Sequence, residues 1–283
     1  MKNKITLFIA LLASASLLAA VSPKEKEALV KLYHATNGAQ WTNTWDLNAP
    51  VNNWFGVVLK NDKVVSVDLS NNHLVGALPA EVTDLVYLQK LNLFRNEISG
   101  VIPASISNLK DLKYLNLSFN KLSGTIPSQL GDLTNLQSIE LFMNELTGSI
   151  PTQIGNLKQL KVLSLFNNEL SGTIPTSIYE LKSLRILLLN SNKLTGKLSH
   201  EVANMSSLEN LSLFENNMDG QVPFDLERLP KLKEMNISYN NFSGAVSRNL
   251  AQLDTLNMTM LNESGLAVVL PVEDRTSALA NEE

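Results

Sequence analysis

Side chains able to do chemistry are few in this sequence and lie far apart. The three histidines, His34, His73 and His200, are in different regions of the chain, and there is no cysteine. Metal sites and catalytic triads need several such groups within reach of one another. The sequence also has no phosphate-binding loop, nucleophile elbow or zinc-binding helix motif. We therefore expect three solvated histidines, no metal and no cofactor.

Carboxylates are the remaining candidates for catalysis. Asp68, Glu140, Glu215 and Glu234 lie where short strands are predicted, and Glu215 and Glu234 would be on adjacent coils. Two neighbouring carboxylates could serve as acid and base on a glycosidic bond. Because the four are spread over several coils, a solvated charged face explains them more simply. We expect a protein that is not an enzyme.

The first twenty residues have the layout of a secretory signal peptide. Lys2 and Lys4 precede an apolar stretch that starts at Ile5, and small residues up to Ala20 suit cleavage there. An uncleaved anchor is the alternative, because the stretch is at the lower limit of membrane-spanning length. Cleavage removes two lysines and no acid, which takes the formal charge from −4 to −6. We expect a secreted, periplasmic or cell-surface protein with no membrane span in the mature chain and no nucleic-acid partner.

A helix is predicted directly after the signal peptide. Ser22 and Glu25 form a capping box, with Pro23 at the first helical position. The apolar residues that follow fall on one helical face: Ala28, Leu29, Leu32 and Tyr33. Gly38 is predicted to end the helix.

A 24-residue repeat dominates the rest of the chain, marked by an asparagine and, four residues later, a glycine. The asparagines are Asn72, Asn96, Asn120, Asn144, Asn168, Asn192, Asn216 and Asn240. The asparagine amide both donates and accepts hydrogen bonds, so we assign these residues to a structural ladder between coils. Self-similarity at this period predicts a solenoid of eight repeats over residues 61–252.

Each repeat predicts one coil of the solenoid. In the repeat that starts at Leu109, Leu115 and Leu117 are two residues apart, which predicts a short strand. Neighbouring strands would pair into a parallel sheet on the concave side, with irregular turns on the convex side. Proline follows the glycine by three residues in six repeats, whereas Ser199 and Ser247 take its place in the other two.

The pattern LxxLxxLxLxxNxLSGxIPxxLGxL resembles the plant-type extracellular leucine-rich repeat of receptor-kinase ectodomains and polygalacturonase inhibitors. Residues 52–70 also resemble that family's amino-terminal cap, C-x-W-x-G-V-x-C. Trp54, Gly56 and Val57 match it, but Asn52 and Leu59 stand at the cysteine positions. In this respect the cap is similar to the cysteine-free caps of secreted bacterial repeat proteins. The resemblance implies an α/β repeat fold: a right-handed leucine-rich-repeat solenoid with a short-stranded parallel concave sheet and a helix-plus-hairpin cap.

The expected domain organisation follows from these features. Residues 1–20 are a signal peptide, 21–60 an amino-terminal cap, 61–252 the repeats, 253–270 a degenerate ninth repeat with a carboxy-terminal cap, and 271–283 a disordered tail. Trp41, Trp45 and Trp54 are predicted to seal the first coil. Leu253, Leu256 and Leu261 are predicted to continue the register of the core.

Positions that differ between repeats are the candidates for binding. They predict outward columns on the concave face, in which one column holds four phenylalanines. The candidate binding residues are Phe94, Arg95, Phe119, Glu140, Phe142, Met143, Phe166, Phe214, Glu215 and Tyr239. Phe142 and Phe166 should stack about 5 Å apart on adjacent coils. The row from Phe94 to Phe214 should extend for roughly 24 Å, the size of a protein interface.

We expect non-catalytic recognition of an extracellular or envelope protein, or of a glycan, on this face. An inhibitor of a secreted glycosidase is a narrower form of this hypothesis. Alternatively, the rings simply pack on one another and cover the sheet. A surface- or ice-binding role is the rival from another class. It needs a flat, regular lattice of one residue type, which the mixed concave columns do not provide.

Overall fold

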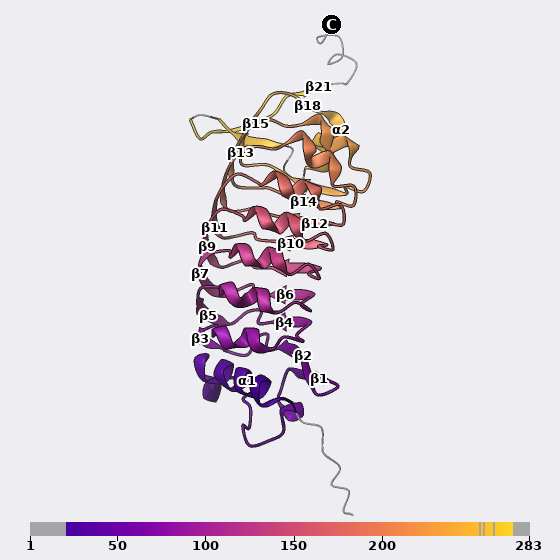
Figure 1. Cartoon of the computed structure of the whole chain (residues 1–283). Helices are drawn as coiled ribbons and strands as arrows, with labels where there is room; N and C mark the ends of the chain where they lie inside the picture. Colours follow the sequence, from indigo (N-terminus) through magenta and orange to yellow (C-terminus); the bar gives the residue numbers. More distant parts are fainter. Residues whose placement is uncertain (1–20, 255, 257, 263, 274–283) are drawn as a thin grey trace, which may run out of the picture.

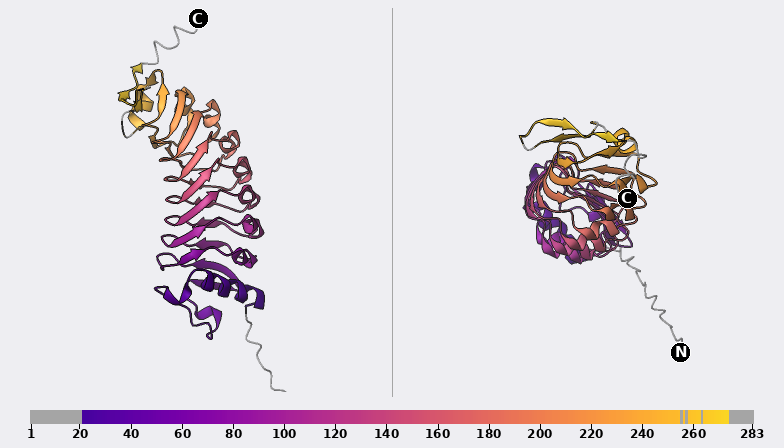
Figure 2. Two further views of the ribbon diagram at one scale, coloured as in Figure 1. Left: turned by 90° about the vertical axis from the view of Figure 1, so that its left-hand side faces the viewer. Right: turned by 90° about the horizontal axis from the view of Figure 1, so that it is seen from above.

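The computed structural model describes residues 21–254, 256, 258–262 and 264–273, so the predicted signal peptide lies outside the described residues. These residues form an elongated stack of coils, with a helical cap at the amino-terminal end and a mixed cap at the other (Figure 1; Figure 2). The predicted solenoid is confirmed.

The amino-terminal cap begins with helix α1 (Pro23–Ala35). Its capping box forms as predicted: the Glu25 N–H donates to Ser22 Oγ (3.3 Å), and the Ser22 hydroxyl donates to Glu25 Oε2 (2.6 Å). The other oxygen of Glu25 accepts the N–H of Val64 (3.0 Å), which ties the helix to the first strands. Gly38 does not end α1. Asn37 takes a left-handed φ of 57°, and Gly38 starts the short 3-10 helix η1 (Gly38–Gln40), which is followed by η2 (Val51–Asn53).

Three tryptophans seal the first coil, as predicted. Trp41, Trp45 and Trp54 are each at most 4% exposed. The rings of Trp45 and Trp54 stack with centroids 4.7 Å apart. Each indole N–H donates to a backbone carbonyl, that of Thr36, Phe55 and Asp46 respectively. The cap therefore buries large apolar area without leaving a polar group unsatisfied.

In the described residues, nine strands form the concave sheet in the order β1-β2-β4-β6-β8-β10-β12-β14-β16. Their bounds are β1 (Val57–Lys60), β2 (Lys63–Asp68), β4 (Lys90–Asn92), β6 (Tyr114–Asn116), β8 (Ser138–Glu140), β10 (Val162–Ser164), β12 (Ile186–Leu188), β14 (Asn210–Ser212) and β16 (Glu234–Asn236). β1 and β2 form an antiparallel hairpin, and the later pairs are parallel, one repeat apart, as in Leu115 opposite Ile139.

The opposite side of each coil is regular, so the predicted irregular convex turns are wrong. Eight short strands form a second sheet in the described residues: β3 (Val75–Ala77), β5 (Glu97–Gly100), β7 (Lys121–Thr125), β9 (Glu145–Gly148), β11 (Glu169–Gly172), β13 (Lys193–Lys197), β15 (Asn217–Gln221) and β17 (Asn241–Ser243). A 3-10 helix follows each of these strands except β17: η3 (Ala80–Asp84), η4 (Ala104–Asn108), η5 (Ser128–Asp132), η6 (Thr152–Asn156), η7 (Thr176–Glu180), η8 (His200–Asn204) and η9 (Phe224–Arg228).

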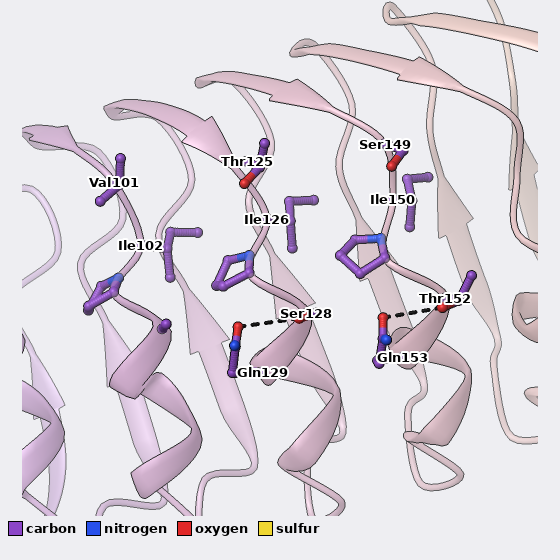
Figure 3. Close-up of a pocket in the computed structure, with 14 residues that line it drawn as sticks. Val101, Ile102, Thr125, Ile126, Ser128, Gln129, Ser149, Ile150, Thr152 and Gln153 are labelled. Atoms are coloured by element: carbon purple, nitrogen blue, oxygen red, sulfur yellow. Dashed lines mark hydrogen bonds between the residues drawn. The ribbon is translucent and has the colours of Figure 1, made fainter.

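The repeat residues explain this second side. Gly100 adopts a φ of 80°, which a side chain would disfavour, where the chain leaves β5. Pro103 precedes η4, and its carbonyl accepts the N–H of Ile106 (2.9 Å), so the proline starts the 3-10 turn. Figure 3 shows successive coils here, with Ile126 and Ile150 in equivalent places.

The asparagine ladder connects each coil to the one before it. Asn144 donates to the carbonyls of Leu117 and Leu141 (both 3.0 Å), and its own carbonyl oxygen accepts the N–H of Leu122 (3.0 Å). Equivalent bonds are made by Asn96, Asn120, Asn168, Asn192, Asn216 and Asn240. Asn72, in the first coil, bonds Asn43 of the cap instead.

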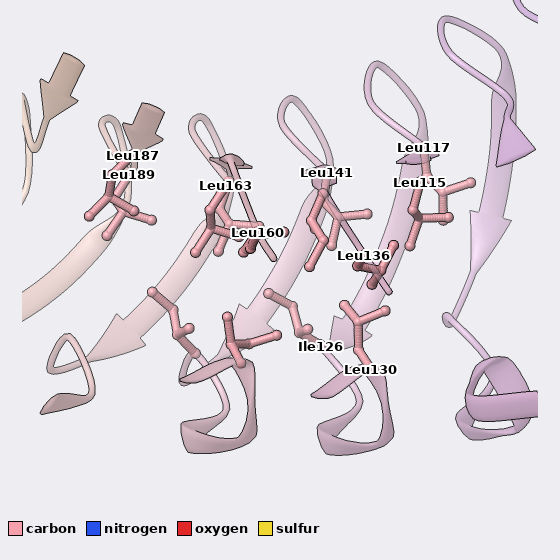
Figure 4. Close-up of a cluster of buried hydrophobic side chains, with 14 of the residues drawn as sticks. Leu115, Leu117, Ile126, Leu130, Leu136, Leu141, Leu160, Leu163, Leu187 and Leu189 are labelled. Atoms are coloured by element: carbon pink, nitrogen blue, oxygen red, sulfur yellow. The ribbon is translucent and has the colours of Figure 1, made fainter. Parts of the chain in front are cut away.

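The core is a continuous column of aliphatic side chains. Leu115 and Leu117 enter it from the concave side, and Ile126 and Leu130 enter from the other side; each is at most 3% exposed (Figure 4). Burying one such side chain stabilises the fold by about 1.5–3 kcal/mol. A single coil would leave these side chains uncovered, so the coils depend on one another for stability.

The carboxy-terminal cap differs from the predicted ninth repeat. It contains α2 (Arg248–Leu253) and the strands β18 (Val246–Ser247), β19 (Thr259–Leu261), β20 (Ala267–Val269) and β21 (Val272–Glu273). Met258 and Met260 are fully buried whereas Leu256 is 40% exposed, so the predicted register of the ninth repeat is wrong. β21 pairs with β18, so residues 272–273 of the predicted disordered tail are ordered.

A buried aspartate closes the last coil. Asp254 is 3% exposed, and its carboxylate accepts the N–H of Ile237 and the hydroxyl of Ser238, both at 2.8 Å. It thereby satisfies polar groups beyond β16, the last strand of the concave sheet.

Candidate functional site

The phenylalanine column lies just beyond the strands of the concave sheet. β4 ends at Asn92, two residues before Phe94. The prediction that these phenylalanines lie on the strands is therefore wrong, because they follow the strands by two residues. The next residue in each coil is left-handed, with φ between 52° and 58°: Asn71, Arg95, Phe119, Met143, Asn167, Ser191, Glu215 and Tyr239. This turn points consecutive side chains in different directions.

Four phenylalanines form one cluster, which we name the concave aromatic patch: Phe94, Phe119, Phe142 and Phe166. Phe142 and Phe166 stack with centroids 4.4 Å apart and an interplanar angle of 9°, which confirms the predicted stacking. Phe119 meets Phe94 and Phe142 edge to face, at 5.6 and 5.9 Å. Such pairs add roughly 0.5–1.5 kcal/mol beyond the area they bury.

Phe119 completes this patch because its coil lacks a phenylalanine at the preceding position. Ser118 stands there and is fully buried, so its coil has no ring in the column between Phe94 and Phe142. The left-handed turn at Phe119 places its ring against both neighbours. Phe119 remains 41% exposed, and the other three rings of the patch are half-buried.

The aromatic row is not continuous to Phe214. Asn190 and Ser191 occupy the coil after Phe166, and no ring contact crosses that coil in the described residues. Phe214 instead pairs with Tyr239, edge to face at 5.3 Å. The predicted row is therefore two clusters, of four rings and of two.

The strands themselves carry outward apolar residues that were not among the predicted binding residues, although Leu188 was expected to face outward. Tyr114 starts β6 and is 47% exposed. Val162, Ile186 and Leu188 lie at outward positions of β10 and β12 and are half-buried. Glu140 ends β8, and the residues two positions before its equivalents in β6, β10 and β12 are Tyr114, Val162 and Ile186, so counting along the repeat would have found them. These side chains extend the apolar surface from the patch across the sheet.

Three charged candidates lie on this face. Glu140 accepts hydrogen bonds from Asn116 Nδ2 (3.1 Å) and from the Ser138 hydroxyl (2.9 Å). Glu215 accepts one from Ser191 (2.8 Å). Arg95 is exposed and has no ion pair among the described residues. Glu234 accepts a hydrogen bond from Asn210 (2.7 Å), and in the described part of the chain no hydrogen bond joins it to the neighbouring Glu215.

Cations line the edge of the sheet where the strands begin. Lys113 and Lys161 donate to the amide oxygens of glutamines one coil earlier. Glu209 lies between Arg185 (2.6 Å) and Lys233 (3.0 Å), whose hydrogen bonds lower its pKa to about 2. This edge carries an excess of positive charge although the chain is acidic.

The histidines remain apart from one another. His73 lies 3.3 Å from Glu97, and His200 lies 2.5 Å from Asp225, whose pKa it lowers. Within the described residues, no three metal-ligating side chains gather at one place. No helix in that part of the chain is long and apolar enough to cross a membrane.

Comparisons with known proteins agree with this architecture. A model described as "Leucine-rich repeat region" matches residues 141–264, and one described as "Leucine rich repeat" matches 62–122 and 86–146. None of the curated proteins compared with the chain matches it.

Three solved structures illustrate the similarity. The plant peptide hormone receptor RGFR1, in complex with RGF2, is 31% identical over 73% of this chain, with a TM-score of 0.64. This chain spans 32% of that receptor, about a third of its length. The BIR2 ectodomain from Arabidopsis thaliana is 32% identical, over 56% of this chain and 86% of its own, with a TM-score of 0.52.

The third is a plant ice-binding protein, 27% identical over 91% of this chain and 99% of its own, with a TM-score of 0.63. The repeat models together run from residue 62 to 264, a range that includes the asparagine ladder from Asn72 to Asn240 and all strands of the two sheets except β1. The chain belongs to the leucine-rich repeat family.

Proposed function

We propose that the protein is a non-catalytic recognition module that binds an extended segment of an extracellular protein on the concave aromatic patch. The observation that carries this proposal is the four-ring cluster beside exposed Tyr114 and the apolar residues of β10 and β12. Apolar surface of this kind, bordered by polar and charged side chains, is typical of binding sites.

The neighbours support a binding role in coarse terms. RGFR1 is a plant peptide hormone receptor that was solved in complex with RGF2, and BIR2 is an ectodomain. Secretion through residues 1–20 is part of the same proposal, because a recognition module of this class acts outside the cell. A glycan ligand that stacks on the rings is the other outcome that the same experiment detects.

The test is capture of partners from secreted and envelope extracts by the mature chain. The double variant Phe142→Ala/Phe166→Ala should lose the captured partner, because it removes the stacked pair. Phe55→Ala is the matched control: this ring is 46% exposed and belongs to the amino-terminal cap. Circular dichroism verifies that both variants remain folded, and Phe119→Glu supplies a second variant at an exposed ring.

Capture that is equal in the wild type and in both concave variants would refute the proposal. If the mature chain binds oligosaccharides on an array and captures no protein, and if the same variants lose this binding, the ligand is a glycan.

Ice binding is a second candidate function, favoured by a surface that the sequence analysis overlooked. The second sheet carries two columns of exposed or half-exposed hydroxyl side chains, which we name the second-sheet hydroxyl array: Ser99, Ser123, Thr147, Ser171 and Thr195, with Thr125, Ser149 and Thr173 beside them. Coils repeat about every 4.8 Å, so the array is regular. The plant ice-binding protein matches 91% of this chain over 99% of its own length, which supports the same candidate.

Three consecutive hydroxyls of this array share one orientation. Ser99, Ser123 and Thr147 each donate to the glycine carbonyl of the preceding coil, at 3.3–3.4 Å. Thr125 and Ser149 also border an uncharged groove of about 750 Å³ above the 3-10 helices (Figure 3). This face has the regularity that the concave columns lack.

Thermal hysteresis of the purified mature chain tests the second candidate. Thr125→Lys/Thr173→Lys should abolish the activity, and both positions are exposed, so stability should change by less than about 0.5 kcal/mol per site. Phe142→Ala/Phe166→Ala is the control and should keep the activity. A wild-type protein without hysteresis would refute this candidate and leave concave recognition untouched.

A further inference from the structure

The carboxy-terminal cap exposes apolar side chains at the end of the stack (Figure 1, in yellow). β20 is exposed along its whole length. The large apolar side chains exposed in this cap are Leu256, Leu266, Val268, Val269 and Val272. The terminal unit of a solenoid usually has a polar outer face, which keeps the molecule soluble. This cap covers the core of the last coil but leaves an apolar surface of its own.

β20 also has a free backbone edge. In the described residues it pairs with β19 alone. The carbonyl of Leu266 and the N–H of Leu270 both form hydrogen bonds on the β19 side of this hairpin (2.9 and 3.2 Å). Alternate residues of an antiparallel strand direct their backbone groups to opposite sides. Ala267 and Val269 therefore direct their N–H and C=O groups away from β19.

This edge lacks the features that usually protect an edge strand. Charged side chains, proline or a covering segment prevent most edge strands from pairing with another chain. β1, the edge strand at the other end of the concave sheet, ends in Lys60. From Leu266 to Val272 there is no charged residue, and Pro271 comes after the strand. Free N–H and C=O groups beside exposed apolar side chains are a template for pairing with another strand.

We propose that β20 is the interface of a two-fold symmetric dimer, in which it pairs antiparallel with β20 of a second copy of this chain. The strand is self-complementary. With the two-fold axis at Val268, Ala267 of each copy faces Val269 of the other, which provides about four backbone hydrogen bonds. Leu266 then faces Leu270 of the other copy, so no like charges meet although the chain is acidic.

The composition of the strand favours a second copy over a partner of different chemistry. From Leu266 to Val272 every side chain is apolar, so the strand offers no charged or polar side chain by which a different partner could be selected. Two copies bury these side chains against their own equivalents and satisfy the free edge of both strands at once.

The size of this surface sets the strength of the dimer. A standard interface has about 20–30 residues on each side, which is more than the cap hairpin and its neighbours provide. We therefore expect a reversible dimer with a Kd on the order of micromolar. The coils of β12, β14 and β16 separate the concave aromatic patch from this cap, so the patch stays open in the dimer (Figure 1).

Sedimentation velocity of the mature chain, at concentrations from roughly 1 to 200 µM, tests the inference. The wild type should shift from monomer to dimer as its concentration rises. Val268→Lys and Val268→Glu should each remain monomeric, because like charges would lie opposite each other at the two-fold axis. An equal mixture of the two variants should recover the dimer, because opposite charges then meet.

Val58→Lys is the matched control. Val58 is 53% exposed on β1, the edge strand at the other end of the molecule, so this variant should dimerise as the wild type does. Circular dichroism verifies that all variants remain folded.

A single introduced cysteine gives a second measurement, because the chain has none of its own. Residues opposite each other in a non-hydrogen-bonded antiparallel pair have Cα atoms about 4.5 Å apart, a distance that a disulfide can bridge. In the proposed dimer Val268 forms such a pair with its own equivalent. Val268→Cys should therefore give a covalent dimer on mild oxidation, and Val58→Cys should not.

Each outcome decides the matter in one direction. Loss of the dimer in Val268→Lys, with recovery in the mixture, supports the inference whatever the capture of partners shows. A wild type that stays monomeric over the whole range would overturn it, and so would a dimer that Val268→Lys leaves intact. Association that Val58→Lys abolishes, or species larger than a dimer, would indicate head-to-tail pairing of β20 with β1 and would also overturn the two-fold dimer.

Discussion

The Asn168→Ala substitution tests the role of the asparagine ladder most directly. Asn168 is 7% exposed, and its amide donates to the carbonyls of Leu141 and Leu165, both at 3.0 Å. Its carbonyl oxygen accepts the N–H of Leu146 at 3.0 Å. Alanine removes all of these bonds together and leaves three backbone groups without their partner in the middle of the stack.

The expected cost follows from these three groups. An unsatisfied buried donor or acceptor costs about 1–3 kcal/mol. Water can enter the space left by the amide and regain part of this free energy. We therefore expect the free energy of unfolding to fall by about 3–5 kcal/mol for the three groups together.

Two measurements check this prediction. Urea denaturation followed by circular dichroism gives the free energy of unfolding, and native-state hydrogen exchange reports on the Leu146 amide, which should lose protection. Asn156→Ala is the matched control, because Asn156 is exposed at the end of η6 and should change stability by less than about 0.5 kcal/mol. A loss below about 1 kcal/mol for Asn168→Ala, with the Leu146 amide still protected, would refute the ladder as the link between coils.

Three further predictions address the cap, the charged edge and the close contact between coils. Trp54→Ala should lower the stability measured by thermal unfolding by about 3–5 kcal/mol, because the ring is only 3% exposed and lies in the core of the cap. A loss below about 1 kcal/mol would show that this ring does not seal the cap. Glu209 should titrate with a pKa of about 2 in carboxyl NMR, and this pKa should move toward about 4.3 in Arg185→Gln. Because its pKa is lowered in the folded state, Glu209 stabilises the fold at pH values above about 4.3 and loses this contribution as the pH falls toward 2. A pKa of Glu209 that is unchanged in Arg185→Gln would contradict the pairing. Gly131→Ala should lower the stability by about 1–3 kcal/mol in the same thermal assay, because a Cβ there would lie 2.3 Å from a backbone oxygen of the next coil. Unchanged stability would mean that the two coils can move apart to make room for the Cβ without a loss of packing.

Much of the fold could be predicted because the same residue types recur at the same positions of every repeat. The 24-residue period of the asparagines places every core leucine, and the capping box at Ser22 and the three tryptophans of the cap are local signals that the structure follows. The second sheet was missed because its strands are short and lie between the ladder asparagine and the repeat glycine, which together with the following proline suggest a turn. The carboxy-terminal register was missed because Met258 and Met260 fill the core where leucines were expected.

The candidate site could be predicted less completely than the fold. The phenylalanines were found because they break the pattern of the repeat, but their separation into two clusters depends on which ring contacts form. Tyr114 was missed because the strands occupy three residues in most coils and begin earlier than the leucine spacing suggests. A polar recess on the surface was not predicted, because its walls come from the cap and from two coils: Thr42, Asn71, His73, Arg95, Asn96 and Glu97.

The sequence by itself determined the repeat, the core and the ladder, because each depends on residue types at a constant interval, and a constant interval becomes a constant position in a solenoid. The tertiary structure alone decided how the irregular positions combine. The left-handed turn after Ser118 brings Phe119 between Phe94 and Phe142, and the pairing of Glu97 with Lys121 leaves Arg95 uncompensated. Those outcomes depend on side-chain direction and on neighbours one coil away, which spacing along the chain does not specify.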